Sequence, residues 1–182
     1  MLPKILVLGD KNAVLVAARI LAYGPEYVVE LTNPNDVEQK MEHTFDLSKC
    51  PFKELPEDVD YSNNLFEYTT PVGKNKIKFS LLTGKEEAMI LKDIDRSRKV
   101  GYNTDITTRL RYTIKEVDGD SKVDTINEFS QNMLARDSAA LRNYIRDISP
   151  DIDLTSEVEI GGQTVSVSIP LTVEFFWPKS LQ

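Results

Sequence analysis

The chain has 182 residues, a formal net charge of −7 at pH 7 and an isoelectric point near 4.9. This acidic balance argues against nonspecific nucleic-acid binding, which depends on Lys and Arg side chains that neutralise phosphates. A single cysteine, Cys50, and a single histidine, His43, exclude an internal disulfide and a zinc site made from Cys and His. The hydrophobic fraction of 41% suffices for a core, and no apolar run is long enough to predict a membrane-spanning helix.

The first predicted elements are a helix and a hairpin. Residues 4–8 favour a short strand or the lead into a helix, and residues 12–23 are apolar almost all round, as in a helix buried on most sides. Asp10 is suited to cap the start of this helix and Gly24 to end it. A strand, a glycine and a helix in this order also occur in nucleotide-binding folds, but no glycine-rich phosphate loop accompanies them here.

The first hairpin is expected from residues 27–31 and 41–47, with a turn at residues 33–36, where Asn, Pro and Asp cluster. His43 lies in its second strand, where a surface or hydrogen-bonded histidine is commoner than a catalytic base. Residues 49–64 are polar and contain two prolines, so we interpret them as the connection between two halves of the chain.

A second hairpin is predicted from residues 65–70 and 76–81, which flank a turn-rich loop. Thr83 and Glu86 then form a capping-box pattern, in which each side chain accepts a hydrogen bond from the other residue's backbone N–H. This pattern predicts a helix that ends near Lys99.

Two further helices are predicted next in the chain. Apolar residues recur at helical spacing over residues 105–117 and again over residues 121–133, with Ser121 as the cap of the second helix. The acidic triplet that begins at Asp118 lacks the further oxygen ligands of a calcium loop, and we interpret it as a turn.

An amphipathic helix is predicted to begin at Asp137 and to stop before Pro150. Its polar face carries Arg142 and Arg146, and its other face carries the apolar residues Ala140, Leu141, Tyr144, Ile145 and Ile148. A hairpin follows, in which the pair Gly161-Gly162 makes a two-residue turn.

The densest aromatic run of the chain is Phe175, Phe176 and Trp177. Aromatic side chains are enriched at the centres of protein interfaces, and they also fill protein cores. The three residues are therefore either docking residues or ordinary core residues. Together with Arg142 and Arg146 they form the candidate protein-contact set.

The two ends of the chain repeat one order of features, namely an aspartate, a helix, a proline stop and a hairpin. We therefore predict an α+β fold in which two helix-plus-β-hairpin units flank a hairpin and a three-helix segment. The expected divisions are residues 1–48, the connection 49–64, and residues 65–182.

Three stretches resemble the T4-type bacteriophage baseplate protein family, which includes hub and hub-assembly proteins of contractile tails. The first is GDKNAVLVAARILAYGPEY with EHTFDLS, residues 9–27 and 42–48. The second is KIKFSLLTGKEE, residues 76–87. The third and most specific is LARDSAALRNYIRDISPDIDL with IPLTVEFFWP at the end of the chain.

The chain departs from this family at its outer hairpins. Many relatives carry a C-P-x-C knuckle in each hairpin, and the two knuckles together resemble a zinc ribbon. Here Asn33 and Asp36 stand where the thiolates of the first knuckle would be, and Gly161-Gly162 replaces the second. Thiolates make a structural zinc site closed and tight. We therefore expect a degenerate, zinc-ribbon-like fold without metal or other cofactor.

The resemblance implies a non-enzymatic tail protein, either a baseplate hub component or a hub assembly factor, that acts through protein–protein contacts. Its partners would be other baseplate or tail proteins, with self-association left open. Its locations would be the virion and, during assembly, the host cytoplasm. One alternative is a general intracellular protein-binding module that descends from a zinc ribbon. Another is an enzyme with clustered carboxylates, although no nucleophile–base pair stands out in the sequence.

Overall fold

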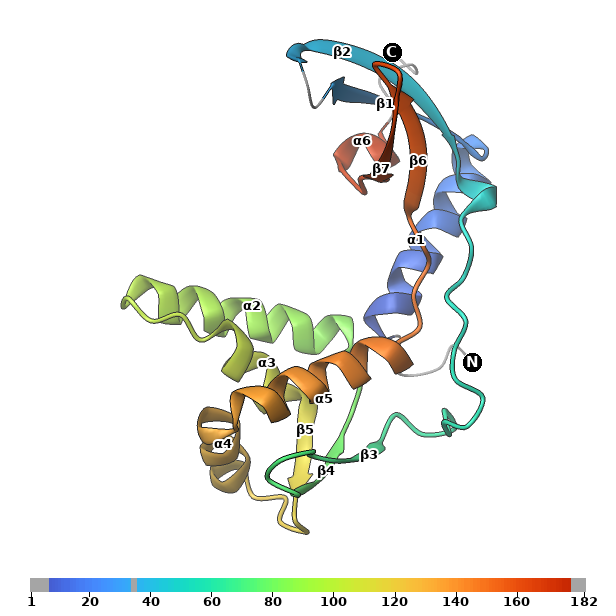
Figure 1. Cartoon of the computed structure of the whole chain (residues 1–182). Coiled ribbons are helices and arrows are strands. Elements are labelled where there is room, and N and C mark those ends of the chain that lie inside the picture. Colours follow the sequence, from blue (N-terminus) through green and yellow to red (C-terminus); the bar gives the residue numbers. More distant parts are fainter. Residues whose placement is uncertain (1–6, 34–35, 178–182) are drawn as a thin grey trace. The chain divides into compact units, whose positions relative to one another are not determined.

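The computed structural model describes residues 7–33 and 36–177, and it confirms the α+β class. The chain folds into two compact units (Figure 1). Unit 1 contains the described residues up to Leu8 together with Glu54–Pro150. Unit 2 contains Gly9–Lys53 together with the described residues from Asp151 onward. In the described part of the chain, no helix has both the length and the apolar character needed to cross a bilayer.

Unit 1 is built on a three-stranded antiparallel sheet in the order β3-β4-β5. The predicted second hairpin is confirmed, and it consists of β3 (Phe66–Thr69) and β4 (Lys76–Phe79). The other edge of β4 pairs with β5 (Ile114–Val117). The helices of this unit are α2 (Gly84–Lys99), α3 (Asp105–Thr113), α4 (Val123–Asn132) and α5 (Ala135–Ile148) (Figure 1).

Side chains from the sheet and from α5 meet in the core of unit 1. Ile77 and Phe79 of β4 are at most 1% exposed, and so are Leu141 and Ile148 of α5. Both α5 residues belong to the apolar face that the sequence pattern predicted. The opposite face of α5 is exposed, so the predicted orientation of this helix is confirmed.

Helix α2 begins as the sequence predicts. The Thr83 hydroxyl accepts a hydrogen bond from the Glu86 backbone N–H at 3.4 Å, and the Glu86 carboxylate accepts one from the Thr83 backbone N–H at 2.9 Å. These bonds satisfy two N–H groups that a helix start leaves without an intrahelical partner. The start of α2 is therefore fixed by its local sequence.

The predicted helix over residues 105–117 is wrong in its last four residues. Helix α3 ends at Thr113, and the following four residues form β5. Ile114 and Val117 are three residues apart, a spacing that fits a helix face. A register shift between β4 and β5 lets both side chains face the core from a strand as well. Backbone pairing with β4 therefore overrides the local pattern.

The predicted cap of helix α4 is also wrong. The helix begins at Val123, and Ser121 does not cap it. The carboxylate of Asp120 serves this end instead, because it accepts hydrogen bonds from the Lys122 N–H at 3.0 Å and from the Thr125 hydroxyl at 2.8 Å. The turn predicted at Asp118-Gly119-Asp120 is present and precedes this helix.

Helix α5 begins at Ala135, two residues before the predicted start. Asp137 is therefore not its N-cap. Its carboxylate accepts hydrogen bonds at 2.8 Å from the backbone N–H groups of Val72 and Gly73, in the loop between β3 and β4. A residue that suits a helix cap thus makes a long-range contact instead.

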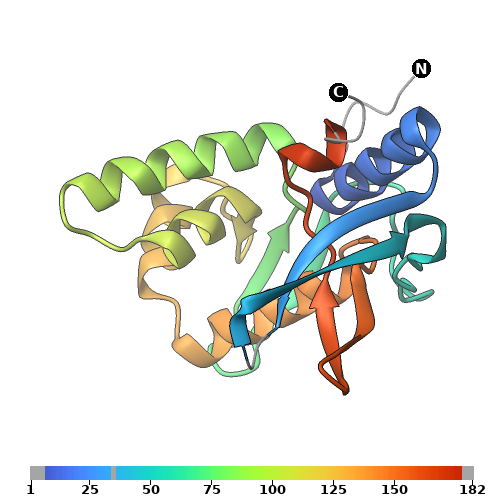
Figure 2. The ribbon, with the colours of Figure 1, turned by 90° about the horizontal axis from the view of Figure 1, so that it is seen from above.

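Unit 2 contains both outer hairpins. The first hairpin follows α1 (Leu8–Tyr23), whose first residue belongs to unit 1, and consists of β1 (Glu26–Asn33) and β2 (Asp36–Asp46). A short 3-10 helix, η1 (Leu47–Lys49), comes next. The second hairpin consists of β6 (Thr155–Ile160) and β7 (Gln163–Ser168), and helix α6 (Val173–Phe176) follows it. Figure 2 shows α1 beside the first hairpin.

The two hairpins of unit 2 share one core. It contains Tyr27 and Phe45 of the first hairpin, Val158 of the second, and Phe175 of α6. The rings of Tyr27 and Phe175 meet edge to face with centroids 5.0 Å apart, and the Tyr27 hydroxyl donates to the Pro170 carbonyl at 3.1 Å. The two outer hairpins therefore pack against each other. The predicted repeat is nevertheless divided, because α5, its second helix, belongs to unit 1.

The boundaries of the units differ from the predicted divisions. The connection over residues 49–64 contains one boundary, after Lys53, but the expected third segment, residues 65–182, is divided after Pro150. The physical reason is that the last hairpin buries its apolar side against the first hairpin. The backbone N–H of Lys53 donates to the carbonyl of Asp151 at 2.9 Å, so both ends of the intervening segment meet inside unit 2.

Helix α1 is less buried than its composition predicts. It begins at Leu8, so Asp10 lies in its first turn and does not cap it. Gly24 ends the helix as expected, with φ at +83°. Along the helix only Val16 and Arg19 are buried. The expectation of a helix buried on most sides is therefore wrong, and one apolar side of α1 remains open.

Candidate functional site

The predicted aromatic run divides between core and surface. Phe175 is fully buried, and Phe176 is partly buried against the same core, with the two ring centroids 5.0 Å apart. Trp177 is 72% exposed. Of the two alternatives that the sequence left open, the core position applies to Phe175 and the exposed position to Trp177.

The other members of the predicted contact set, Arg142 and Arg146, lie on the exposed face of α5 in unit 1. Arg142 Nε donates to the Ser138 carbonyl at 3.3 Å, one turn earlier in the helix. Arg146 forms an ion pair with the adjacent Asp147 at 3.0 Å. The predicted set is thus divided between the two units.

A second apolar surface, on helix α1, was not predicted from the sequence. Val14 is 52% exposed and Leu21, two turns later on the same side, is 87% exposed. Ala17 and Ala18 lie between them and are exposed as well. We call these four residues the outer stripe. The signal for it was the all-round apolar character of the helix, which predicts a covering on both sides.

The inner side of α1 is held in place by a buried guanidinium. Arg19 is only 4% exposed and lies over the ring of Tyr23, 4.7 Å from its centroid. Its guanidinium donates to the carbonyls of Gly24 and Glu26, each at 3.3 Å. These contacts tie α1 to the start of the first hairpin, so the outer stripe is carried by an anchored helix.

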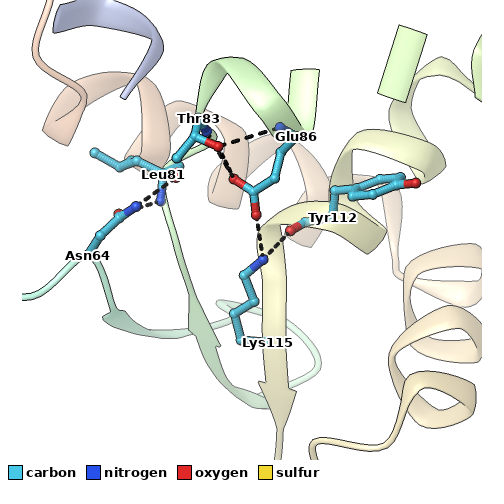
Figure 3. Close-up of polar contacts among 6 residues, drawn as sticks. All are labelled: Asn64, Leu81, Thr83, Glu86, Tyr112 and Lys115. Carbon is cyan, nitrogen blue, oxygen red and sulfur yellow. Dashed lines mark hydrogen bonds and ion pairs between the residues drawn. The ribbon is translucent and has the colours of Figure 1, made fainter. Parts of the chain in front are cut away.

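A polar cluster lies at the start of α2 (Figure 3). In addition to its bonds with Thr83, the Glu86 carboxylate accepts from Lys115 Nζ at 3.0 Å, and Lys115 also donates to the Tyr112 carbonyl at 2.7 Å. Burial raises the pKa of Glu86, but the hydrogen bonds from Thr83 and the contact with Lys115 outweigh it and lower the pKa overall. Glu86 is therefore a carboxylate at neutral pH, and it joins α2 to β5.

Beside this cluster, the Asn64 side chain forms the pair of backbone hydrogen bonds that a neighbouring strand would form. The Asn64 amide donates to the Leu81 carbonyl at 2.9 Å and accepts from the Leu81 N–H at 2.8 Å (Figure 3). These two bonds satisfy both backbone groups of a residue just beyond β4. They anchor the end of the predicted connection, and their role is structural.

The cysteine and the histidine lie in ordinary surroundings. Cys50 is partly buried, and this burial raises the pKa of its thiol. The ring of His43 meets that of Phe45 edge to face, with centroids 4.6 Å apart. Among the residues that the structure describes, no group of three or more His, Cys, Asp or Glu side chains is placed to hold a metal ion.

The two positions at which a zinc ribbon would carry its knuckles lie at the turns of the outer hairpins. Asn33 and Asp36 are paired at the end of β1 and β2, and the two residues between them lie outside the described part of the chain. At the second knuckle, Gly161 and Gly162 have φ of +60° and +80°, which suits a tight two-residue hairpin turn.

Comparison of the chain with protein-family models, with curated proteins and with solved structures finds no match. We therefore infer its function from the geometry described above.

Proposed function

We propose that this chain is a non-enzymatic tail protein of a T4-type bacteriophage, either a baseplate hub component or a hub assembly factor. It acts by binding other tail proteins. The resemblance of residues 9–27, 76–87 and 134–154 to that family supports this class of protein. In this proposal the protein is located in the virion baseplate and, during assembly, in the host cytoplasm.

The observation that carries the proposal is the outer stripe of α1. Burying one valine or leucine side chain contributes about 1.5–3 kcal/mol. In the free chain Val14 is 52% exposed and Leu21 is 87% exposed, so Val14 lacks half of this burial and Leu21 lacks most of it. The alanines between them are small enough for another helix or a sheet to approach closely. Such a stripe has the chemistry of a protein-binding surface, because it offers apolar area and no polar group for catalysis.

Trp177 adds an exposed anchor in the same unit. Tryptophan is among the residue types that dominate binding energy in protein interfaces. In unit 1, the exposed guanidinium groups of Arg142 and Arg146 suit a separate polar contact surface. The net charge of −7 disfavours DNA as the main partner, which leaves other proteins as the expected class.

Affinity capture of the tagged full chain from phage-infected cells tests this proposal, with mass spectrometry of the captured proteins and of purified virions. We expect hub and baseplate proteins to copurify. The double change Val14→Ser and Leu21→Ser should reduce their recovery by about ten-fold. Leu91→Ser, which alters an exposed leucine on α2 in unit 1, should leave recovery unchanged. Circular dichroism should show that all variants keep the fold.

Two results would contradict the proposal. Capture of host proteins alone would favour the general protein-binding module. Normal baseplates in a phage that lacks the whole gene would exclude an essential role in assembly.

A further inference from the structure

A small pocket in unit 1 is lined only by polar and charged side chains. It lies where α3 runs between α2 and α4 (Figure 1), and its volume is about 220 Å³. Each of the three helices contributes, with Arg96 from α2, Arg111 from α3 and Ser130 from α4. A hollow of this size and lining suits a small polar guest better than an apolar one.

Two polar atoms in this pocket are buried and lack a partner. Ser130 is 3% exposed, and among the described residues its hydroxyl has no hydrogen-bonding partner. The same holds for Oδ1 of Asn127, one turn earlier on α4. Buried polar atoms in folded proteins are almost always satisfied, so a pair of such atoms in one pocket indicates a partner that comes from outside the chain.

The position of Ser130 strengthens this inference. It lies four residues after Ile126, which is buried in the core, and so occupies the inner side of α4. An alanine there would leave no polar group unsatisfied, and a serine in a helix can bond the carbonyl four residues before it. The Ser130 hydroxyl does not make that hydrogen bond, and it lines the pocket instead.

Three charged side chains line the pocket, Arg96, Arg111 and Asp93, so its lining carries one net positive charge, which favours an anion. Arg111 forms a close ion pair with Asp93 at 2.6 Å, and the Tyr112 hydroxyl donates to the same carboxylate at 2.9 Å. Arg96 lies 3.8 Å from Asp93 and its side chain is 81% exposed. Two guanidinium groups thus share one carboxylate, and the more exposed of them can turn toward a guest.

We propose that this pocket binds a small oxyanion that also carries a hydroxyl group, for which hydrogen phosphate is the simplest example. Arg96 and Arg111 contact the anionic oxygens, because a guanidinium matches phosphate geometry with paired N–H groups. The Ser130 hydroxyl donates to a further oxygen. Oδ1 of Asn127 accepts from the hydroxyl of the guest.

Isothermal titration calorimetry of the full chain with inorganic phosphate at constant ionic strength tests the proposal. We expect saturable binding of one phosphate per chain. Arg96→Gln and Ser130→Ala should each weaken this binding by about ten-fold. Arg98→Gln is the matched control, because it removes the same charge from the same helix at a residue that pairs with Asp105 and does not line the pocket. It should change the affinity by less than about two-fold.

A second measurement separates binding from folding. Without phosphate, Ser130→Ala should unfold at the same or a higher temperature than the unaltered chain, because it removes an unsatisfied buried hydroxyl. Phosphate should then raise the unfolding temperature of the unaltered chain and of Arg98→Gln, and raise that of Ser130→Ala much less.

Three outcomes would contradict the proposal. Absence of saturable phosphate binding at millimolar concentrations would mean that the pocket holds only water. Equal weakening by Arg96→Gln and Arg98→Gln would mean that phosphate responds to the general charge of the helix end. Sulfate, which has no proton to donate at neutral pH, should bind more weakly than phosphate, and equal affinity would contradict the role given to Asn127.

Discussion

The carboxylate of Asp137 accepts a hydrogen bond from the backbone N–H of Gly73 at 2.8 Å, although the two residues are 64 positions apart. The same carboxylate accepts from the neighbouring Val72 N–H, also at 2.8 Å, and Asp137 is only 2% exposed. One buried side chain thus satisfies two amides of the β3–β4 loop. It fixes that loop to the first turn of α5.

Asp137→Ala tests this contact. We expect the free energy of unfolding to fall by about 2–4 kcal/mol, because two buried N–H groups lose a charged acceptor. Urea denaturation followed by circular dichroism measures the change. Asp147→Ala is the control, since Asp147 lies on the same helix but is exposed, and it should change stability by less than about 0.5 kcal/mol. Similar losses in both variants would show that the loop contact has no special weight.

Two glycines of unit 1 are expected to respond in opposite ways to alanine. A Cβ atom at Gly73 would lie 2.6 Å from Oδ1 of Asn75 and 3.0 Å from Oδ2 of Asp137. Gly73→Ala should therefore lower the free energy of unfolding by about 1–3 kcal/mol. At Gly84, in the first turn of α2, nothing lies within 4 Å, so Gly84→Ala should be neutral or stabilise by up to about 1 kcal/mol. Thermal unfolding of the two variants checks the contrast, which would fail if both changed stability in the same direction.

The aromatic run predicts a separation of stability from binding. Phe175→Ala should lower the free energy of unfolding by about 3–5 kcal/mol, because the ring is fully buried. Trp177→Ser should alter it by less than about 0.5 kcal/mol and should reduce the capture of tail proteins. Denaturation and affinity capture on the same samples measure both effects. Global unfolding of the Trp177→Ser variant would place this residue among the core contacts.

The lowered pKa of Glu86 predicts that the folded chain loses stability in acid. Its pKa in the folded chain is lowered from the ordinary value of 4.5, so the folded state binds its proton less readily than the unfolded state. The contribution is complete above the unfolded pKa and disappears as pH falls through the folded pKa. Glu86→Gln should be less stable than the unaltered chain at neutral pH, and the difference should shrink below about pH 4. Urea titrations across this range measure the difference, and a constant gap would contradict the assignment.

The protein is expected to contain no stoichiometric zinc, because the chain has one cysteine and one histidine. Elemental analysis after dialysis should find far less than one zinc per chain. Addition of a chelator should leave the thermal unfolding curve unchanged. One tightly held zinc per chain would require ligands other than those of a zinc ribbon.

Features that depend on neighbouring residues were predictable from the sequence. The Thr83–Glu86 capping box, the end of α1 at Gly24 and the Gly161-Gly162 turn all occur where expected. In each case the residues that determine the structure lie within a few positions of one another. The α+β class follows from the same local patterns.

Features that depend on distant residues were not predictable. The strand after Thr113 exists because β4 offers a free edge, and Asp137 leaves the cap position because a loop 64 residues earlier offers two amides. In the candidate site, the aromatic run Phe175, Phe176 and Trp177 could be recognised in the sequence. Its division between core and surface could not, because only the core of unit 2 determines which ring is covered. Ser130 carried no signal, since a single serine in an amphipathic helix is ordinary.

The segment between Lys53 and Asp151 is inserted into unit 2, and a backbone hydrogen bond joins these two residues at its ends. On the ribosome, the first hairpin therefore emerges well before β6, β7 and Phe175, which complete its core. Tyr27 and Phe45 stay uncovered by the last hairpin until β6, which begins at Thr155, has been made. A nascent chain that stops before this return carries unfinished apolar surface, so truncated products of this gene are expected to aggregate.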